Sequence, residues 1–321
     1  MNYNEQINPE LRRIAKNIPY NRAIIWCANL FQLIFFRLTT VPGEIAHQSM
    51  TLAGYQMLDF KTDLFQPSNI TGKLPGLIYV HGGAFSYRAS SYHKKLACMY
   101  ARNANCRVYF PHYHRTPKYP FPAAYEDVLA LYRHISEHSE ELGINRNAIG
   151  IAGDSAGASI AALISNYYKQ ENLPPPCLQM LVYPVTDGTM QTDSMKKFSD
   201  TPLWNAKNNR RMWSYYCKNS PYDASPLHSC LPPIIPDTYI ELAEYDCLHD
   251  EGMLYGKKLI EAGASVEINE TLGTIHGYDS AINTKIAARN IEKRISFLKR
   301  KFHSGPPVEP ISSSYFITVI E

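Results

Sequence analysis

One short motif in the sequence carries a side chain that could act as a nucleophile. Residues 153–157 read Gly-Asp-Ser-Ala-Gly, a G-x-S-x-G pattern with Ser155 at its centre. The apolar run 148–152 precedes the motif and the small-residue run 158–163 follows it, so we expect a tight turn from a buried strand into a helix. Such a turn has no room for large neighbours and pushes the serine hydroxyl clear of the sheet. The context favours a nucleophilic serine over a Gly-rich turn without chemistry.

A second Gly-rich segment could stabilise a negatively charged intermediate. Residues 81–85, His-Gly-Gly-Ala-Phe, directly follow an expected strand. Acyl transfer through a tetrahedral intermediate needs backbone N–H donors about 3 Å from the developing oxyanion. We expect these donors to be Gly83 and Ala84, with Gly82 as a near alternative, joined by Ala156 after the nucleophile. No G-x-x-x-x-G-K sequence follows, which disfavours a phosphate-binding loop.

A serine nucleophile also needs a base and a carboxylate that orients the base. Among the histidines downstream of Ser155, His276 lies in a loop between an expected strand and the final helix, where it could reach back over the sheet. The carboxylate is expected on the loop after the preceding strand. Asp246 is the first aspartate there and is preferred. Asp250 opens the next helix, where the macrodipole stabilises a carboxylate for purely structural reasons.

The rest of the chain must position these residues, and its pattern indicates a sheet between helices. From residue 76 onward, short apolar runs alternate with longer helical patterns. The expected strands are 77–80, 107–111, 148–152, 178–183, 239–243 and 265–269, and the expected helices are 91–103, 123–138, 156–169, 250–262 and 280–302. Continuous apolar strands that alternate with helices predict an α/β fold, with a mostly parallel central sheet covered on both faces.

Two regions interrupt this alternation. Residues 1–45 look helical and precede the first expected strand, and residues 188–222 are polar and rich in aromatic side chains. Both are expected over the carboxyl ends of the strands, where open α/β sheets place their ligands.

The segment 23–36 is the one stretch apolar enough to suggest a membrane. It is 14 residues long and contains Asn29 and Gln32, whereas a spanning helix needs about 20 apolar residues. We therefore expect a buried helix and no stable membrane insertion, with contact to a membrane surface as the alternative.

Composition excludes several classes of function. The chain has 321 residues, 45% of them apolar, and 32 Lys and Arg balance 29 Asp and Glu to a net charge of +3. Because the basic residues are scattered, no nucleic-acid partner is expected. The seven cysteines include no C-x-x-C pair, which predicts free thiols and a cytoplasmic location.

Together the motifs resemble those of the hormone-sensitive-lipase-like group of α/β-hydrolase esterases, in its bacterial branch. That group shows HGGGF, PFPAAxED, GDSAG, ASPL, LPP, a DPLxDEG loop and HGF. Their counterparts here are residues 81–85, 120–127, 153–157, 224–227, 231–233, 246–252 and 276–278. The resemblance runs from about residue 55 to 300, and the joint spacing is highly specific.

The resemblance implies an α/β-hydrolase fold with a two-part helical cap. The cap would comprise 1–45 and 188–222, the core 46–187 and 223–303, and residues 304–321 would form a C-terminal tail. The group's catalytic residues fall on Ser155, Asp246 and His276, and its oxyanion donors on Gly83, Ala84 and Ala156. A cap helix of the group appears as Met212-Trp213 with Tyr216, and these residues with Trp204 are expected to line the substrate pocket.

The activity implied is that of a serine carboxylesterase on small, short-acyl esters, with no cofactor and no metal. An arylformamidase or small amidase would use the same triad and remains open. A small-molecule receptor that has lost catalysis is disfavoured because all three triad residues are present. The sequence leaves a homodimer open.

The chain departs from the group's pattern at several positions. Ala84 replaces the third glycine of HGGGF, and Cys247 replaces a proline in the loop of the acid. His112-Tyr113-His114-Arg115 stands where the group has D-Y-R-L, which puts a local ion pair in doubt. A metal site at His112 and His114 is disfavoured, because no third ligand stands at a suggestive spacing.

Overall fold

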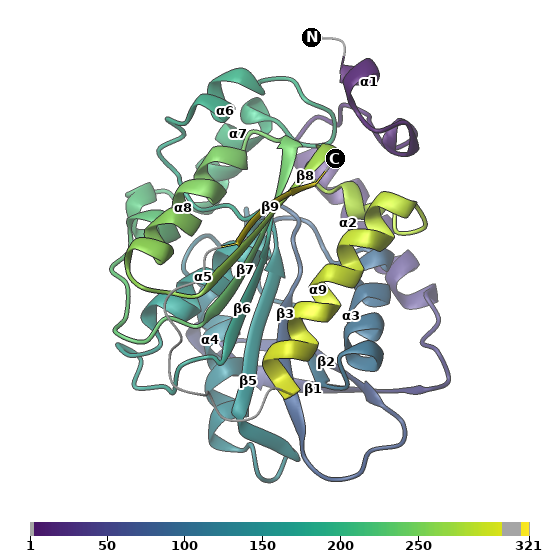
Figure 1. The fold of residues 1–321 in the computed structure, drawn as a ribbon, viewed down its shortest axis with the longest axis vertical. Coiled ribbons are helices and arrows are strands. Elements are labelled where there is room, and N and C mark those ends of the chain that lie inside the picture. Colours follow the sequence, from purple (N-terminus) through teal and green to yellow (C-terminus); the bar gives the residue numbers. More distant parts are fainter. Residues whose placement is uncertain (1–2, 304–315, 321) are drawn as a thin grey trace.

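The computed structural model describes residues 3–303 and 316–320, which form one mixed, mostly parallel sheet with helices on both faces (Figure 1). Within these residues the sheet has nine strands in the order β1-β2-β4-β3-β5-β6-β7-β8-β9. The strands are β1 Ile45–Ala53, β2 Asp59–Pro67, β3 Leu74–Val80, β4 Arg107–Pro111, β5 Ile144–Asp154, β6 Leu178–Val182, β7 Asp237–Tyr245, β8 Val266–Ile275 and β9 Phe316–Ile320. Only β2 pairs antiparallel, with β1 and with β4. The predicted α/β fold is confirmed.

The helices cover the sheet much as the alternating pattern predicted. They are α1 Tyr3–Gln6, α2 Arg22–Leu38, α3 Ser91–Asn103, α4 Ala123–Glu137, α5 Ala156–Tyr167, α6 Asp193–Lys197, α7 Ala206–Tyr216, α8 His249–Glu261 and α9 Lys285–His303. In Figure 1, α9 and α3 lie on one side of the sheet, to its right, and α4 and α5 lie on the other side, to its left. Every residue of β3 is buried, as expected of a central strand covered on both faces.

The boundaries differ from the prediction where they affect the site. Strand β8 continues to Ile275, so His276 directly follows a strand instead of lying within a longer loop. The final helix begins at Lys285, and a short 3-10 turn occupies Tyr278–Ser280. Of the expected tail 304–321, residues 316–320 form β9 beside β8, whereas 304–315 and 321 lie outside the described residues.

Helix α2 contradicts the expectation of a buried helix. Only Ile25 and Phe36 are buried. Asn29 and Gln32 face inward, where Asn29 bonds the backbone of Ser86 and Arg88 and Gln32 donates to Ser90. The outer face is apolar and exposed, and its side chains are Trp26, Leu30, Phe31, Ile34, Phe35 and Leu38. Because the polar side chains of Asn29 and Gln32 attach this helix to the core, its apolar side faces away from the core.

No helix in the part of the chain that the structure describes is long and apolar enough to span a bilayer.

The two regions that interrupt the alternation meet each other above the strand ends. The Leu203 N–H donates to the Lys16 carbonyl at 2.9 Å. The Asn208 side chain donates to the carbonyl of Ile18, and Arg211 donates to that of Tyr20. The N-terminal segment is thus tied to the 188–222 segment by hydrogen bonds between residues about 190 positions apart.

Candidate active site

The G-x-S-x-G motif forms the turn between β5 and α5 that its sequence predicted. Ser155 stands at this turn with φ 53° and ψ −118°, a conformation that an L-residue rarely adopts. Both glycines are needed for close approach. A Cβ on Gly153 would lie 2.4 Å from the backbone of Gly157, and one on Gly157 would lie 2.0 Å from the Val80 carbonyl oxygen. The backbone therefore presents the hydroxyl at the end of the central strand.

Three of the predicted site residues form one hydrogen-bonded chain. Ser155 Oγ lies 2.8 Å from Nε2 of His276, and Nδ1 of His276 lies 2.7 Å from Oδ2 of Asp246. The other carboxylate oxygen of Asp246 accepts the N–H of Leu248 at 3.0 Å. Asp246 is fully buried, whereas Ser155 and His276 keep 7% and 8% of their surface exposed. The serine and the imidazole therefore remain reachable while the carboxylate is shielded.

Asp250, the competing acid, does not contact His276. Its carboxylate accepts the Ser194 N–H at 2.7 Å and lies 2.8 Å from Nδ1 of His249. Those contacts lower the pKa of Asp250 against the opposing effect of partial burial, which acts to raise it. The geometry fits a structural role for the Asp250 carboxylate, which is the role that the sequence analysis expected when it preferred Asp246 as the acid.

The Gly-rich loop, residues 81–87, places backbone donors beside Ser155. Within the described chain, the N–H groups of Gly83, Ala84 and Ala156 make no hydrogen bond. Gly82 is different, because its N–H donates to Oδ2 of Asp154 at 3.0 Å. This contact corrects the expectation that Gly82 could be an alternative oxyanion donor. A Cβ on Gly82 would lie 2.2 Å from that carboxylate, so the position needs glycine for a structural reason.

Asp154 ties the Gly-rich loop to the serine turn, a role that the sequence analysis did not assign. Its carboxylate accepts the Tyr79 hydroxyl at 3.0 Å and lies 3.2 Å from Nε2 of His93. Burial acts to raise the pKa of Asp154, but His93, Tyr79 and the Gly82 N–H outweigh it and leave the pKa below its ordinary value. The carboxylate therefore stays ionised and holds the two backbone segments in register.

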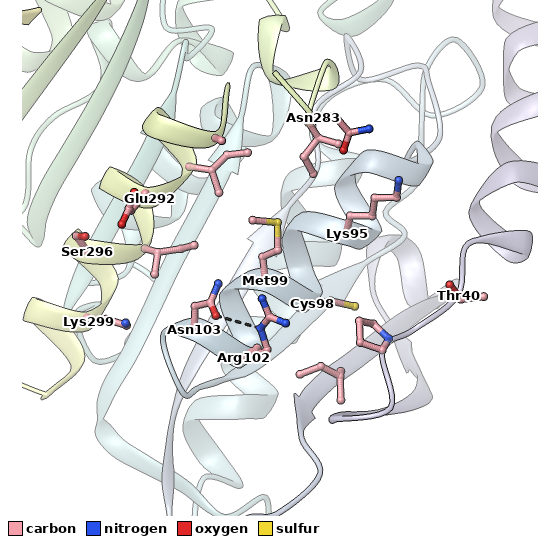
Figure 2. Close-up of a pocket in the computed structure, with 16 residues that line it drawn as sticks. Thr40, Lys95, Cys98, Met99, Arg102, Asn103, Asn283, Glu292, Ser296 and Lys299 are labelled. Atoms are coloured by element: carbon pink, nitrogen blue, oxygen red, sulfur yellow. Dashed lines mark hydrogen bonds between the residues drawn. The ribbon is translucent and has the colours of Figure 1, made fainter. Parts of the chain in front are cut away.

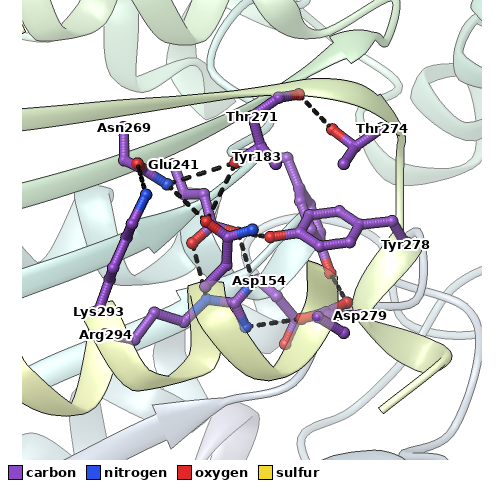
Figure 3. A network of polar contacts seen from close by, with 12 residues as sticks. Asp154, Tyr183, Glu241, Asn269, Thr271, Thr274, Tyr278, Asp279, Lys293 and Arg294 are labelled. Atoms are coloured by element: carbon purple, nitrogen blue, oxygen red, sulfur yellow. Dashed lines mark hydrogen bonds and ion pairs between the residues drawn. The ribbon is translucent and has the colours of Figure 1, made fainter. Parts of the chain in front are cut away.

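A buried ionic network supports His276 from behind (Figure 3). The Tyr183 ring lies 4.6 Å from the His276 ring, and its hydroxyl donates to Asp279 at 2.6 Å. Arg294 on α9 donates to Asp279 at 2.7 Å and to both oxygens of Glu241 on β7. Although burial opposes ionisation, Arg294 lowers the pKa of Glu241. No pattern in the sequence indicates this network, because its members lie on four separate elements.

The cavity at Ser155, here called the serine cavity, has a volume of about 190 Å³. Its lining residues are Gly83, Ala84, Tyr87, Tyr92, Asp154, Ser155, Tyr183, Leu203, Trp204, His276, Gly277 and Ser280. Of the four expected pocket residues, only Trp204 is among them. Met212, Trp213 and Tyr216 are buried in the packing beneath, where the Tyr216 ring stacks on Phe85 with centroids 3.5 Å apart. The sequence analysis missed the three tyrosines and Leu203, whose only signal was their nearness to the motifs.

Larger hollows elsewhere carry none of the predicted catalytic residues. One of about 650 Å³ lies between α3 and α9, and Figure 2 shows side chains of these helices on its two walls.

No cluster of three or more metal-binding side chains occurs among residues 3–303 and 316–320. His112 and His114 point to different carboxylates instead, Asp63 and Asp127, each at 2.8 Å.

Comparison with known proteins places the chain in a family. Residues 77–280 match the model of the alpha/beta hydrolase fold family. Carboxylesterase NlhH of Mycobacterium tuberculosis is 29% identical over 312 residues, which cover 93% of this chain and 97% of that protein. The ethyl acetate hydrolase of Pseudomonas putida is 30% identical over 74% of this chain and 76% of its own length. Among solved structures, a bacterial heroin esterase superposes with a TM-score of 0.86 at 27% identity, covering 94% of this chain and 99% of that one.

Carboxylesterase NlhH and the heroin esterase match more than nine tenths of the chain, and the family model covers the serine turn, the acid's loop and His276 in one stretch. The chain therefore belongs to the alpha/beta hydrolase family, in its hormone-sensitive-lipase-like group of carboxylic ester hydrolases.

Proposed function

We propose that this protein is a serine carboxylesterase that hydrolyses small esters with short acyl chains through a covalent acyl-enzyme. The observation that carries the proposal is the hydrogen-bonded chain from Asp246 through His276 to Ser155, which ends at a small cavity lined by unpaired backbone N–H groups. Nucleophile, base, orienting acid and anion donors are the parts that acyl transfer requires.

In the acylation step, Ser155 Oγ attacks the ester carbonyl carbon while His276 Nε2 takes the hydroxyl proton. The carbonyl oxygen becomes an oxyanion that accepts hydrogen bonds from Gly83, Ala84 and Ala156. The tetrahedral intermediate then collapses. The bond to the alcohol oxygen breaks, and His276 returns its proton to the departing alcohol.

Deacylation repeats the sequence with water. His276 removes a proton from a water molecule, whose oxygen attacks the acyl carbon. The second intermediate expels Ser155 Oγ, which recovers its proton from His276, and the carboxylic acid leaves. Throughout, the buried Asp246 carboxylate fixes the imidazole tautomer and stabilises the imidazolium that forms twice per turnover.

The preference for short acyl chains rests on the size of the serine cavity and on what covers it. About 190 Å³ is small for a substrate site, and Trp204, Tyr87 and Leu203 wall it. We assign 1–45 and 188–222 to one cap, whose two parts are joined by the hydrogen bonds to Lys16, Ile18 and Tyr20. The name of the Pseudomonas relative, ethyl acetate hydrolase, points to the same size class.

The test combines active-site labelling with a substrate series. After reaction with a fluorophosphonate, peptide mapping should find the adduct on Ser155 alone. The kcat/KM for p-nitrophenyl esters should peak between about C2 and C8, because each methylene adds up to about 0.8 kcal/mol until the pocket ends. A maximum at C12 or longer would overturn the short-acyl assignment. Faster turnover of p-nitroacetanilide or N-formylaniline than of p-nitrophenyl acetate would make the protein an amidase or formamidase.

A further inference from the structure

A second cavity lies behind the Gly-rich loop, on the other side from Ser155. It has a volume of about 880 Å³ and is bounded by the inner face of α2, by β1 and β2, and by residues 112–119. Ser86 of the loop and Arg88, which directly follows the loop, line this cavity, whereas Gly83 and Ala84 line the serine cavity. The loop is thus the wall between two separate spaces.

Positive charge dominates the lining of this second space, here called the basic cavity. Its cationic side chains are Arg37, Lys61, Arg88, Lys94, Arg115 and Lys118, against the two carboxylates of Asp59 and Asp63. The chain as a whole carries a net charge of only +3, so this lining concentrates more positive charge than the rest of the molecule displays. An anionic ligand would be attracted here rather than to the surface at large.

The buried carboxylate of Asp63, which lines the basic cavity, already has partners within the protein. Asp63 accepts a hydrogen bond from Ser49 at 2.6 Å and lies 2.8 Å from Nε2 of His112 and 3.2 Å from Nε2 of His47. Asp127, next to the cavity, lies 2.8 Å from Nδ1 of His114. These histidines occupy the carboxylates that could otherwise neutralise the arginines.

The arginines have no acidic partner in the described residues. Arg115 is partly buried, and its one hydrogen bond goes to the carbonyl of Tyr113 at 3.0 Å. No carboxylate lies within ion-pair distance of Arg37, Arg88 or Arg115 in residues 3–303. Burial, and then the neighbouring charge of Arg88, lower the pKa of Arg115 to about 10. Burial and the charge of Arg37 lower the pKa of Arg88 in the same way.

Arg88 is repelled by the charges of both Arg115 and Arg37, and a bound anion would offset this repulsion. Partly buried charges are normally paired, and the planar fork of arginine matches phosphate and carboxylate oxygens in bidentate contacts. A phosphate monoester carries about −1.5 to −2 charges at neutral pH, which suits several cations better than a single carboxylate does. Phe36, Phe60 and Tyr119 add apolar wall for an organic group.

We propose that the basic cavity binds a small organic molecule through its phosphate monoester group, with Arg88 and Arg115 as the main ligands of the phosphate. The site is separate from the ester site and does not depend on the proposed function. Its residues come partly from the segment 112–118, which includes the His-Tyr-His-Arg sequence that stands in place of the group's D-Y-R-L.

A ligand bound in the basic cavity would contact the segment that holds the Gly-rich loop, and this loop carries the proposed oxyanion donors. The segment that carries Arg115 also holds the loop, because the Tyr113 hydroxyl donates to the His81 carbonyl at 2.8 Å and the Thr116 N–H donates to the Phe85 carbonyl at 2.9 Å.

Isothermal titration calorimetry with phenyl phosphate tests the proposal, using benzoate and phenol as matched ligands at physiological salt. Phenyl phosphate should bind the wild-type protein. Arg115→Gln and Arg88→Gln should each raise its dissociation constant about tenfold or more, the expected loss of a charge-assisted hydrogen bond. Arg146→Gln removes the same charge from an exposed position outside the cavity and should leave binding unchanged.

Several results would overturn the proposal. Absence of phenyl phosphate binding to the wild type would do so, as would equal weakening by Arg115→Gln and Arg146→Gln, which would indicate non-specific attraction. Benzoate binding as tightly as phenyl phosphate would reject the phosphate assignment. Because Arg115 is partly buried, thermal unfolding checks that its variant is folded, and the more accessible Arg88→Gln gives an independent reading.

Discussion

The two sides of the Gly-rich loop differ in how their cavities are assembled. The serine cavity is built mainly at the ends of the neighbouring parallel strands β3, β5, β6 and β8 and from the turns that follow them. The basic cavity is built from a helix, an antiparallel strand pair and a loop that meet only in the folded chain. The catalytic residues of the serine cavity lie in short motifs that can be recognised in the sequence. The residues of the basic cavity are spread over segments that form no such motif.

The two sides also balance charge differently. Around Ser155 the carboxylates of Asp246 and Asp154 each face a histidine, so each has a polar partner within the protein. Behind the loop, Arg88 and Arg115 line one cavity, and no described carboxylate lies within ion-pair distance of either. The charges around Ser155 are paired within the protein, which suits a reaction that begins and ends with the same protonation states. The positive charges of the basic cavity are not paired, which suits a ligand that supplies negative charge.

The largest expected effect is on the serine side. Ser155→Ala should lower kcat for p-nitrophenyl acetate by about 10⁴ to 10⁶, because the nucleophile is removed and nothing nearby replaces it. The fold should survive, because His276 keeps its hydrogen bond to Asp246 and its Nε2, which loses Ser155 Oγ, borders the serine cavity. Steady-state kinetics and thermal unfolding check both points. Turnover near that of the wild type would reject the serine mechanism.

The second prediction separates the two candidate acids. Asp246→Asn should lower kcat by about 10⁴, since an amide at this position favours the wrong tautomer of His276. Asp250→Asn is the matched control and should keep most of the activity, because its carboxylate bonds Ser194 and His249 instead. The reverse ranking would mean that the acid lies on α8.

A third prediction concerns the network behind His276. Arg294→Leu leaves Glu241 and Asp279 buried without a counter-charge and should reduce the unfolding free energy by about 3–5 kcal/mol. Lys73→Leu breaks an exposed pair with Glu140 and should cost less than about 1 kcal/mol. Urea denaturation measures both. Equal losses would show that the network adds nothing beyond a surface ion pair.

The fourth prediction tests the wall of the basic cavity. Burial acts to raise the pKa of Asp63, but His112, Ser49 and His47 outweigh it and hold the pKa at about 2, below the ordinary 3.8. Asp63 therefore contributes stability above pH 4, on the order of 2 kcal/mol, which is lost as the pH falls through about 2. The wild type should exceed Asp63→Asn in unfolding free energy at pH 6, and the difference should shrink towards pH 2. A pH-independent difference would contradict the pairing.

The smallest expected effect is on the outer face of α2. Trp26 is 70% exposed, so Trp26→Ser should change the unfolding free energy by less than about 0.5 kcal/mol. Its neighbour Ile25 is buried, and Ile25→Ala should cost about 2 kcal/mol or more. Denaturant titration of both variants checks the orientation of the helix. Similar losses would mean that the outer face is covered by another surface in solution.

The sequence predicted the parallel strands and the residues at their ends because a doubly covered strand is a continuous apolar run, visible without any partner. β1 was missed because Ile45 is its only buried residue and its residues 47–49 are polar and exposed. β2 was missed although five of its residues are buried, since charged Asp59, Lys61 and Asp63 break up the apolar run.

Orientation was harder to predict than secondary structure. The apolar run 23–36 was correctly expected to be helical, but its hydrophobicity pointed to burial. Asn29 and Gln32 face the core because the backbone of Ser86 and Arg88 and the Ser90 hydroxyl offer them partners there. Met212, Trp213 and Tyr216 show the converse, since side chains expected at the substrate are used for packing. These contacts depend on the positions of loops, which the hydrophobic periodicity of a helix or strand does not predict.

The left-handed backbone of Ser155 has a consequence for how this protein could be improved. A non-glycine residue at φ 53° and ψ −118° carries about 1–3 kcal/mol of conformational strain that the surrounding fold must absorb. Glycine would relieve that strain and would abolish the chemistry. Directed evolution for heat resistance alone would thus favour loss of the hydroxyl at this position, so any such selection needs turnover of an ester as a second criterion.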